Sequence, residues 1–362
     1  MEKDLMAVLG QFALEAPVNA IRPLGSGLIN DTFKVETAGD APDYVLQRIN
    51  HAIFTDVDML QRNIVAVTRH IRAKLAAAGE TDLDRKVLRF LPLKGEDKTW
   101  FFDGASYWRV SVFISNAFTY DTVNPEYSGY AGEAFGRFEA MLADIPDQLG
   151  ESIPDFHNME LRARQLEEAA AADKAGRMKD PEVQSILAEL RKYSFDMCLA
   201  ERLYREGKLP KRICHCDTKV NNMLFDAQGN VLCVIDLDTV MPSFVFSDFG
   251  DFLRTAANTV AEDSPEVDQV AFRRDIFEAF ATGYVKSASA FLTPLEKEML
   301  PYGVLLFPYM QAVRFFADYL NGDTYYKIKY PEHNLVRTRN QLALFHSALE
   351  NKDYMSRFIA GF

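Results

Sequence analysis

Cysteine is scarce in this sequence. The 362 residues include four, at positions 198, 214, 216 and 233. Cys214 and Cys216 lie two apart on a presumed strand and would point to the same side of it, but no second close pair of cysteines or histidines accompanies them. We therefore expect reduced core cysteines, as in a cytosolic protein, with a zinc site as the minor alternative.

Positive charge and long hydrophobic runs are also lacking. Lysine and arginine number 40 against 52 aspartates and glutamates, so the net charge is 40 − 52 = −12. An acidic surface disfavours nucleic acid as a partner, because phosphate backbones require basic patches. No apolar stretch reaches the roughly 18 residues of a membrane span, and residues 1–4 are too charged to begin a signal peptide. We expect a cytoplasmic protein of two or three packed domains without a membrane partner. Its oligomeric state is left open.

One stretch, ICHCDTKVNNMLFDAQGNVLCVIDLD at residues 213–238, carries most of the candidate chemistry. Two short apolar runs, Met223–Phe225 and Val231–Ile235, flank a polar turn in which Gly229 can take a positive φ. This pattern predicts a β-hairpin. The hairpin would bring together the polar residues at its two ends, which are Asp217, Lys219, Asn222 and Asp236.

Those four side chains suit a magnesium ion and phosphate groups. Mg²⁺ prefers hard oxygen ligands, of which the protein supplies few and water and substrate phosphates supply the rest. The alternative is a buried hairpin whose polar ends are satisfied within the protein.

The order His-x-Asp-x-Lys-x-x-Asn, beginning at His215, is similar to the catalytic loop of protein kinases. The wider frame of HCDTKVNN, VIDLDTVMP and SDFGD resembles the aminoglycoside phosphotransferase and choline kinase superfamily. Within it, RFFADYLNGDTYY and YPEHNLVRTRNQL look most like segments of N-acetylhexosamine 1-kinases. The resemblance implies an α+β, bilobal, protein-kinase-like fold that uses ATP and Mg²⁺. We expect a mainly antiparallel, nucleotide-binding lobe over residues 1–115 and a larger, mainly helical lobe for catalysis and substrate over residues 116–362.

The apolar patterns agree with this layout. Strands are predicted for the first lobe at residues 21–24, 32–35, 44–49, 87–91, 99–102 and 107–114. Helices are predicted at residues 4–14, 56–77, 126–142, 161–175, 181–205, 268–287, 294–320 and 332–350.

Three places in the first lobe would bind the nucleotide. Gly25-Ser26-Gly27 between two strands is typical of a phosphate-covering loop, although an ordinary hairpin turn gives the same pattern. The third strand has Gln47 and Arg48 where a protein kinase has its phosphate-binding lysine. The backbone from Phe113 to Ser115 would meet the adenine edge.

The glutamate that pairs with such a lysine is missing as well. Asn63 is the nearest polar candidate on the following helix. Three replacements are open: a neutral contact between Gln47 and Asn63, phosphate binding by Arg48, or a larger share of the γ-phosphate charge on Lys219.

The implied reaction is transfer of the ATP γ-phosphoryl group to a hydroxyl, which needs positioning and charge neutralisation. Asp217 would accept the hydroxyl proton and Lys219 would neutralise the growing charge. Asn222 and Asp236 would hold Mg²⁺, and His215 is expected to be structural.

Two further aspartates need a role. Asp238 could assist a second metal ion or hold substrate. Asp248 stands where the superfamily braces the catalytic loop, and Ser247 or Asp248 could cap the next helix. Asp248 begins an Asp-Phe-Gly order like that of protein kinases, but it comes too late, so Asp236 remains the metal ligand.

The N-acetylhexosamine 1-kinase likeness implies that Asn30, Arg314 and Tyr325 line the sugar pocket, together with Asp217. Arg314 would grip hydroxyl or carbonyl oxygens through its planar fork, although an ion pair with Asp318 is a competing role. Leu28 stands where these sugar kinases have a histidine.

Three functions remain open from the sequence. The first is an N-acetylhexosamine 1-kinase. The second is another small-molecule kinase of the superfamily, acting on an aminoglycoside, a choline-like alcohol or homoserine. The third is a nucleotide-binding pseudokinase, which the missing Lys–Glu pair suggests and the retention of Asp217, Asn222 and Asp236 opposes.

Overall fold

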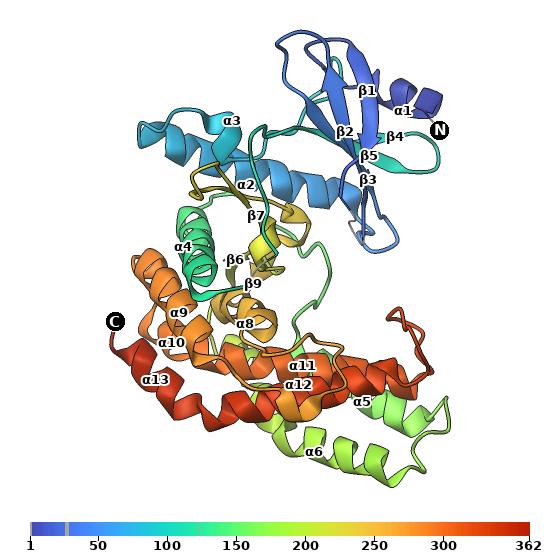
Figure 1. Cartoon of the computed structure of the whole chain (residues 1–362), viewed down its shortest axis with the longest axis vertical. Helices are drawn as coiled ribbons and strands as arrows, with labels where there is room; N and C mark the ends of the chain where they lie inside the picture. The colour runs from blue at the N-terminus through green and yellow to red at the C-terminus, as the bar shows by residue number, and fades with distance from the viewer. Residues whose placement is uncertain (1, 26–28, 122) are drawn as a thin grey trace. The chain divides into compact units, whose positions relative to one another are not determined.

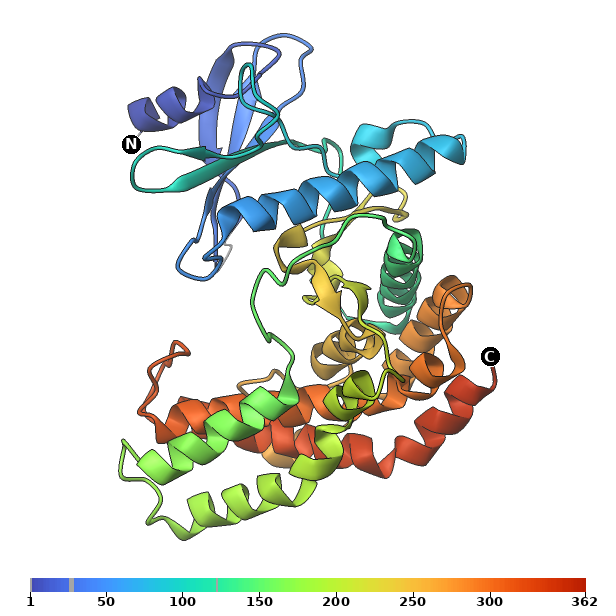
Figure 2. The same ribbon diagram turned by 180° about the vertical axis from the view of Figure 1, so that it is seen from behind.

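The computed structural model describes residues 2–25, 29–121 and 123–362, which divide into two packed units (Figures 1 and 2). Unit 1 comprises residues 1–120, 141–154 and 221–241, and unit 2 comprises residues 121–140, 155–220 and 242–362. Each unit is therefore assembled from segments that are distant in the sequence. The expected division of the chain into a lobe of residues 1–115 and a lobe of residues 116–362 remains a prediction.

A five-stranded antiparallel sheet in the order β1-β2-β3-β5-β4 is the framework of unit 1 (Figure 1). Its strands are β1 (Val18–Pro23), β2 (Asp31–Thr37), β3 (Tyr44–Ile49), β4 (Phe101–Phe102) and β5 (Tyr107–Val112). The predicted strand at residues 87–91 is wrong. Only the residues around Phe90 meet β5, through an isolated bridge to Ser111 that is flanked by two backbone hydrogen bonds of 2.9 Å.

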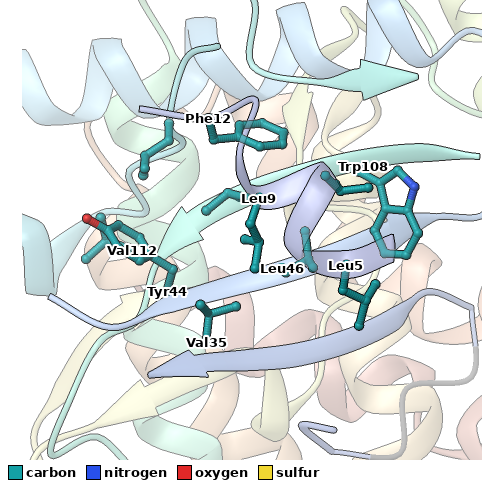
Figure 3. Packing of buried hydrophobic residues seen from close by; sticks show 11 residues of the cluster. Leu5, Leu9, Phe12, Val35, Tyr44, Leu46, Trp108 and Val112 are labelled. Carbon is teal, nitrogen blue, oxygen red and sulfur yellow. The ribbon is translucent and has the colours of Figure 1, made fainter. Parts of the chain in front are cut away.

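Helix α1 (Glu2–Leu9) packs on the apolar face of this sheet. Figure 3 shows side chains of α1 and the following turn lying against strand residues two apart, which share one face of the sheet. The labelled members are Leu5, Leu9, Phe12, Val35, Tyr44, Leu46, Trp108 and Val112. Full burial of one such large side chain contributes about 1.5–3 kcal/mol, so this cluster stabilises the packing of α1 on the sheet.

The remaining elements of unit 1 are α2 (Val57–Ala77), α3 (Leu83–Lys86), the strands β7 (Met223–Phe225) and β8 (Val231–Val234), and the 3-10 helix η2 (Leu237–Thr239). Helix α2 begins after Asp56, whose side chain accepts the N–H of Met59. It buries Leu60, Ile64 and Val67 at helical spacing, so its predicted extent is confirmed.

Unit 2 is built mainly of helices around α11 (Leu300–Leu320), which is buried along nearly its whole length. The neighbours of α11 are α5, α8 and α12 (Figure 2). The other elements lie wholly or mostly in unit 2 and are α4 (Pro125–Leu142), α5 (Met159–Ala172), α6 (Pro181–Met197), α7 (Leu199–Arg205), β6 (Arg212–Cys214), β9 (Met241–Ser243), α8 (Val245–Ala256), η3 (Val267–Gln269), α9 (Arg274–Ala288), α10 (Pro294–Glu298), α12 (His333–Glu350) and α13 (Lys352–Ala360). The 3-10 helix η1 (Val220–Asn222) begins in unit 2 and ends in unit 1.

Glycines allow two pairs of these helices to approach closely. A Cβ atom on Gly132 of α4 would lie 2.1 Å from the carbonyl oxygen of Phe280 on α9. A Cβ atom on Gly250 of α8 would lie 2.3 Å from the carbonyl oxygen of Gly303 on α11. The glycine of the SDFGD segment is therefore explained by helix packing.

The predicted helix at residues 181–205 is interrupted at Cys198, where α6 ends and α7 begins. The carbonyl oxygen of Met197 accepts the hydroxyl of Tyr302 at 2.6 Å, so a side chain satisfies the carbonyl freed there. The α+β fold class, with an antiparallel N-terminal sheet and a larger helical part, is confirmed. Among residues 2–25, 29–121 and 123–362 we find no helix with the length and hydropathy of a membrane span.

Candidate active site

The predicted hairpin is confirmed by the pairing of β7 with β8. Met223 lies opposite Val234, and the N–H of Ile235 donates to the carbonyl oxygen of Asn222 at 2.9 Å. Asn222 is thereby held next to the segment that ends in Asp236, within unit 1. Hard oxygen donors at one end of a hairpin fit Mg²⁺, so the residues present suit this ion. The metal role of these two residues remains a prediction.

Asp236 has an unusual backbone conformation. Its φ is +61°, in the left-handed region that non-glycine residues rarely occupy. Such a conformation costs of order 1–3 kcal/mol and persists only where the surrounding structure enforces it.

The loop that contains Asp217 is held by Asp248 of α8, within unit 2. One carboxylate oxygen of Asp248 accepts the N–H of His215 at 2.6 Å, and the other accepts the N–H of Cys216 at 2.7 Å. The hydroxyl of Thr218 donates to the carbonyl oxygen of Asp248 at 2.7 Å. The expected bracing role is confirmed. The helix-capping role is wrong, because α8 begins at Val245 and its cap position is Phe244.

A second acid, Glu139 of α4, lies beneath Asp248. Its Oε2 accepts the hydroxyl of Tyr284 from α9, and its Oε1 has no donor among the described residues. A carboxyl oxygen of each acid and the sulfur of Cys214 lie within 4.8 Å of one another. Burial and the charge of Asp248 raise the pKa of Glu139 well above its ordinary value. Burial raises the pKa of Asp248 as well, but both of its oxygens accept N–H groups, so we expect Glu139 to be the member of this pair that holds a proton.

His215 is a structural residue, as expected. Its ring is fully buried and meets the rings of Phe135 and Phe138 edge-on, at centroid distances of 5.4 and 5.8 Å. Its Nδ1 accepts the N–H of Asp217 at 3.3 Å. The ring thus fixes the turn of the loop.

Asp217 and Lys219 project from this loop with partly exposed side chains, 38% and 41% accessible. The Nζ of Lys219 lies 2.9 Å from Oδ2 of Asp217, so the loop presents a carboxylate and a cation together. Below them, Asp251 of α8 accepts the N–H of Thr218 at 3.0 Å. Burial, reinforced by the charge of Asp217 and opposed by Arg254, raises the pKa of Asp251 to about 7.

A buried cation of the unit 1 sheet, Arg109, lies on β5, and no motif in the sequence singled it out. Arg109 lies opposite Gln47 in the register of β3 and β5. Its Nη2 donates to Oδ2 of Asp238 at 2.9 Å, its Nη1 to Oδ1, and its Nε to the side-chain oxygen of Gln47 at 2.9 Å. Asn30 donates to Oδ2 of Asp238 at 2.7 Å. Asp238 therefore accepts hydrogen bonds from two protein side chains, and its suggested part in holding a second metal ion or substrate remains a prediction.

The other residues predicted to bind the nucleotide also belong to unit 1. Arg48 is half-exposed and pairs with Asp31. Gly25 has φ +70°, and Gly27 and Leu28 lie outside the described residues. Ser115 is exposed, and the N–H of Phe113 donates to the carbonyl oxygen of Asp43 at 2.9 Å, which commits that donor. Nucleotide binding by these residues remains a prediction.

The contact suggested between Gln47 and Asn63 is wrong. The amide of Gln47 donates to the hydroxyl of Thr32 at 3.2 Å, while its oxygen accepts from Arg109. The side chain of Asn63 bonds both backbone groups of Gly150, at 2.7 and 3.1 Å, and the carbonyl oxygen of Val240 at 3.3 Å. Each amide is therefore occupied elsewhere.

In unit 2, Arg314 of α11 does not pair with Asp318. The carboxylate of Asp318 instead accepts backbone N–H groups of the following loop, from Thr324, Tyr325 and Tyr326. The guanidinium of Arg314 lies 5.7 Å from the ring centroids of both Phe156 and Tyr326. Tyr325 is 72% exposed. Arg314 is thus free of the competing ion pair, and the sugar-binding role of Asn30, Arg314 and Tyr325 remains a prediction.

Sequence reasoning missed two residues beside Arg314. Arg162 donates to the carbonyl oxygen of Phe156 at 2.9 Å, and His157 stacks on the Phe156 ring with a centroid distance of 4.4 Å. Burial, together with the charges of Arg314, Arg162 and Arg254, lowers the pKa of His157 to about 3, while the charge of Asp217 acts in the opposite sense. Within the described part of the chain, neither Arg162 nor Arg314 has a carboxylate partner within 4.0 Å. No local pattern announced this cluster, because its members meet only through the tertiary fold.

Comparisons with known proteins agree with this picture. A family model described as the phosphotransferase enzyme family matches residues 20–286. An aminoglycoside phosphotransferase from Alicyclobacillus acidocaldarius has the same fold with a TM-score of 0.65 at 15% identity, over 99% of this chain and 96% of that chain. A choline kinase from Cryptosporidium parvum has the same fold with a TM-score of 0.59 at 11% identity, over 100% of this chain and 99% of that chain. For the ADP-bound aminoglycoside phosphotransferase APH(2'')-Ib, the TM-score is 0.52 at 13% identity, over 95% of this chain and 99% of that chain.

Proposed function

Because the chain belongs to the phosphotransferase enzyme family, we propose that it is an ATP-dependent kinase of a small molecule. The acceptor we propose is the anomeric hydroxyl of an N-acetylhexosamine, so that the product is a sugar 1-phosphate. The observation that carries the proposal is the loop of His215 to Lys219. Its backbone is fixed by Asp248, while Asp217 and Lys219 remain accessible to a ligand.

In the proposed reaction Asp217 accepts the proton of the acceptor hydroxyl as its oxygen attacks the γ-phosphorus and the bond to the ADP oxygen breaks. Lys219 neutralises the negative charge on the transferred group. Asn222 and Asp236 would hold Mg²⁺, which supplies charge neutralisation for the phosphates when bound. ATP as the donor is supported by ADP in the solved structure of APH(2'')-Ib, a protein of the same fold.

The charges in unit 2 support an oxygen-rich acceptor over a cationic one. Arg162 and Arg314 lie close enough to His157 to depress its pKa, and the charge of Asp217 acts on the same ring. A quaternary ammonium or an aminoglycoside would meet these guanidinium groups as like charges, whereas sugar hydroxyl and carbonyl oxygens would accept their N–H groups. The C-terminal likeness to sugar kinases points the same way.

A panel assay tests the proposal. The purified chain is incubated with Mg²⁺ and ATP and, separately, N-acetylglucosamine, N-acetylgalactosamine, kanamycin, choline or homoserine. ADP release is measured and the product is identified by phosphorus NMR. We expect turnover with an N-acetylhexosamine and phosphate on the anomeric oxygen. Turnover only with kanamycin, choline or homoserine would replace the acceptor, and ATP binding without turnover on any compound would favour a pseudokinase.

A further inference from the structure

The third strand of unit 1 lacks the lysine that protein kinases use, yet a neighbouring strand of the same sheet, β5, contains a buried arginine. Arg109 and Asp238 are each 3% exposed and joined through both guanidinium Nη atoms and both carboxylate oxygens. A third guanidinium N–H, on Nε, donates to the side-chain oxygen of Gln47. Because three of its five N–H groups are bonded within the protein and its side chain is buried, Arg109 is poorly placed to grip a phosphate directly.

The same pair ties three strands to the segment after the hairpin. Asn30, just before β2, donates to Asp238 and accepts the N–H of Asn50, which follows β3, at 2.9 Å. Gln47 of β3 links Arg109 to Thr32 of β2. The 3-10 helix η2, which contains Asp238, is thus anchored to the sheet from several sides.

Asp236 is the residue that this anchor constrains. It immediately precedes η2 and holds its left-handed φ of +61°, while the next two residues, Leu237 and Asp238, are each 3% exposed. A strained residue keeps its conformation when its neighbours cannot move. The Arg109–Asp238 pair supplies that restraint two residues away.

We propose that the buried pair of Arg109 and Asp238 is a positioning device that sets Asp236 for Mg²⁺ and thereby takes over the organising part of the missing Lys–Glu pair. Neither Arg109 nor Asp238 binds the nucleotide or the metal. The inference rests on the proposed function, because it assumes that the chain binds Mg²⁺ with ATP.

The alternative is that Asp238 itself binds the metal ion, and the two arrangements predict opposite changes in Mg²⁺ affinity when Arg109 is removed. If Asp238 were itself a metal ligand, Arg109 would compete with the ion, and removing the arginine would tighten Mg²⁺ binding. If the pair positions Asp236, removing the arginine leaves a buried unpaired carboxylate, disturbs η2 and weakens Mg²⁺ binding.

The test uses the full chain with Arg109→Met, Arg109→Gln and Asp238→Asn. Arg109→Gln retains one hydrogen-bond donor and serves if the methionine variant does not fold, which circular dichroism melting shows. Arg22→Met is the matched control, because Arg22 lies on β1 of the same sheet in an exposed pair with Glu36, 3.5 Å apart. Calorimetry measures ATP affinity with Mg²⁺ and with a chelator, and the ratio of the two affinities reports the metal contribution.

We expect the ratio to fall roughly 10–100-fold in the Arg109 and Asp238 variants, the range typical of losing a residue that orients a metal ligand, and to be unchanged in Arg22→Met. A higher ratio in Arg109→Met or Arg109→Gln would make Asp238 a metal ligand and overturn the inference. Ratios within twofold of the parent in all folded variants would overturn it as well. Failure of the proposed function is a different result, namely that the unmodified chain binds no ATP.

Discussion

Two buried aspartates, Asp238 in unit 1 and Asp248 in unit 2, hold neighbouring segments of the same sequence block in different ways. Asp238 is neutralised by the guanidinium of Arg109. Among the described residues, no lysine or arginine pairs with Asp248. It receives two backbone N–H groups and lies beside Glu139, whose pKa is raised well above its ordinary value by burial and by the charge of Asp248. The first brace is an ion pair, and the second is a pair of neighbouring acids of which we expect one to hold a proton.

This difference predicts different sensitivities. An arginine remains charged at every pH at which the protein is folded, so the cation of the unit 1 brace does not depend on a titratable proton. The unit 2 brace depends on a proton and on close helix packing. We therefore expect lesions near Asp238 to act on metal affinity and lesions near Asp248 to act on turnover, stability and pH dependence.

The largest expected effect is at Asp217, on the loop that Asp248 braces. Asp217→Asn should lower kcat by about 10²–10⁴-fold, because the variant cannot accept the hydroxyl proton. The KM for ATP should stay within twofold. Asp275→Asn is the control, since Asp275 is an exposed residue of unit 2 paired with Arg273. Steady-state kinetics check both values, and equal rates for Asp217→Asn and the parent would remove the base assignment.

Next in size is the contact between α4 and α9 that brings Glu139 to Tyr284. Gly132→Ala would press a methyl group against the carbonyl oxygen of Phe280 and should lower the unfolding free energy by roughly 1–3 kcal/mol. Gly129→Ala on the same helix is the control, because its Cβ would meet only the carbonyl oxygen of Ala279, at 3.8 Å. Urea unfolding measures both, and equal losses would show that close approach is not the cause.

The acid pair is tested by two replacements of Glu139. Glutamine can accept the hydroxyl of Tyr284 and presents a neutral amide beside Asp248, so Glu139→Gln should stay within about 1 kcal/mol of the parent. Glu139→Ala should lose roughly 1–3 kcal/mol and lower kcat. Thermal melts and kinetics separate the variants. If glutamine is as damaging as alanine and mass spectrometry finds a bound metal, the cluster with Cys214 is a metal site instead.

A further prediction concerns the pH dependence of stability. The pKa of Asp251 is raised from 3.8 to about 7 in the folded protein, so the folded state binds this proton more tightly than the unfolded chain. The unfolding free energy should therefore decrease as pH rises from about 4 to about 7 and should not change further through Asp251 above that range. Asp251→Asn should remove this part of the slope in urea titrations at several pH values. An unaltered slope would contradict the assignment.

Local patterns predicted what depends on neighbours in the sequence. The hairpin followed from Gly229 between two apolar runs, and β3 from its alternation at residues 44–49. The bracing by Asp248 came from the resemblance to a known superfamily. In contrast, Arg109 and Asp238 are 129 residues apart, and no spacing rule links a strand residue to a partner at that distance.

The predictions that failed did so for related reasons. Residues 87–91 have a strand-like composition, but only the part around Phe90 meets β5, and the length of a strand depends on its partner as well as on its own residues. Aspartate is a residue type that often caps helices, but Asp248 accepts N–H groups of the loop at His215 and Cys216 instead. Arg314 has a carboxylate one turn away on its own helix, yet Asp318 binds the N–H groups of the next loop instead.

Both tryptophans of the chain, Trp100 and Trp108, belong to unit 1, and Trp108 is part of the cluster between α1 and the sheet (Figure 3). Tryptophan fluorescence, excited at the red edge of the ultraviolet band where only indole absorbs, will consequently report the unfolding of unit 1. It will not report the unfolding of the helices of unit 2. Comparing this signal with far-ultraviolet dichroism, which α11 and its neighbours dominate, gives a label-free way to ask whether the two units unfold in one step or in sequence.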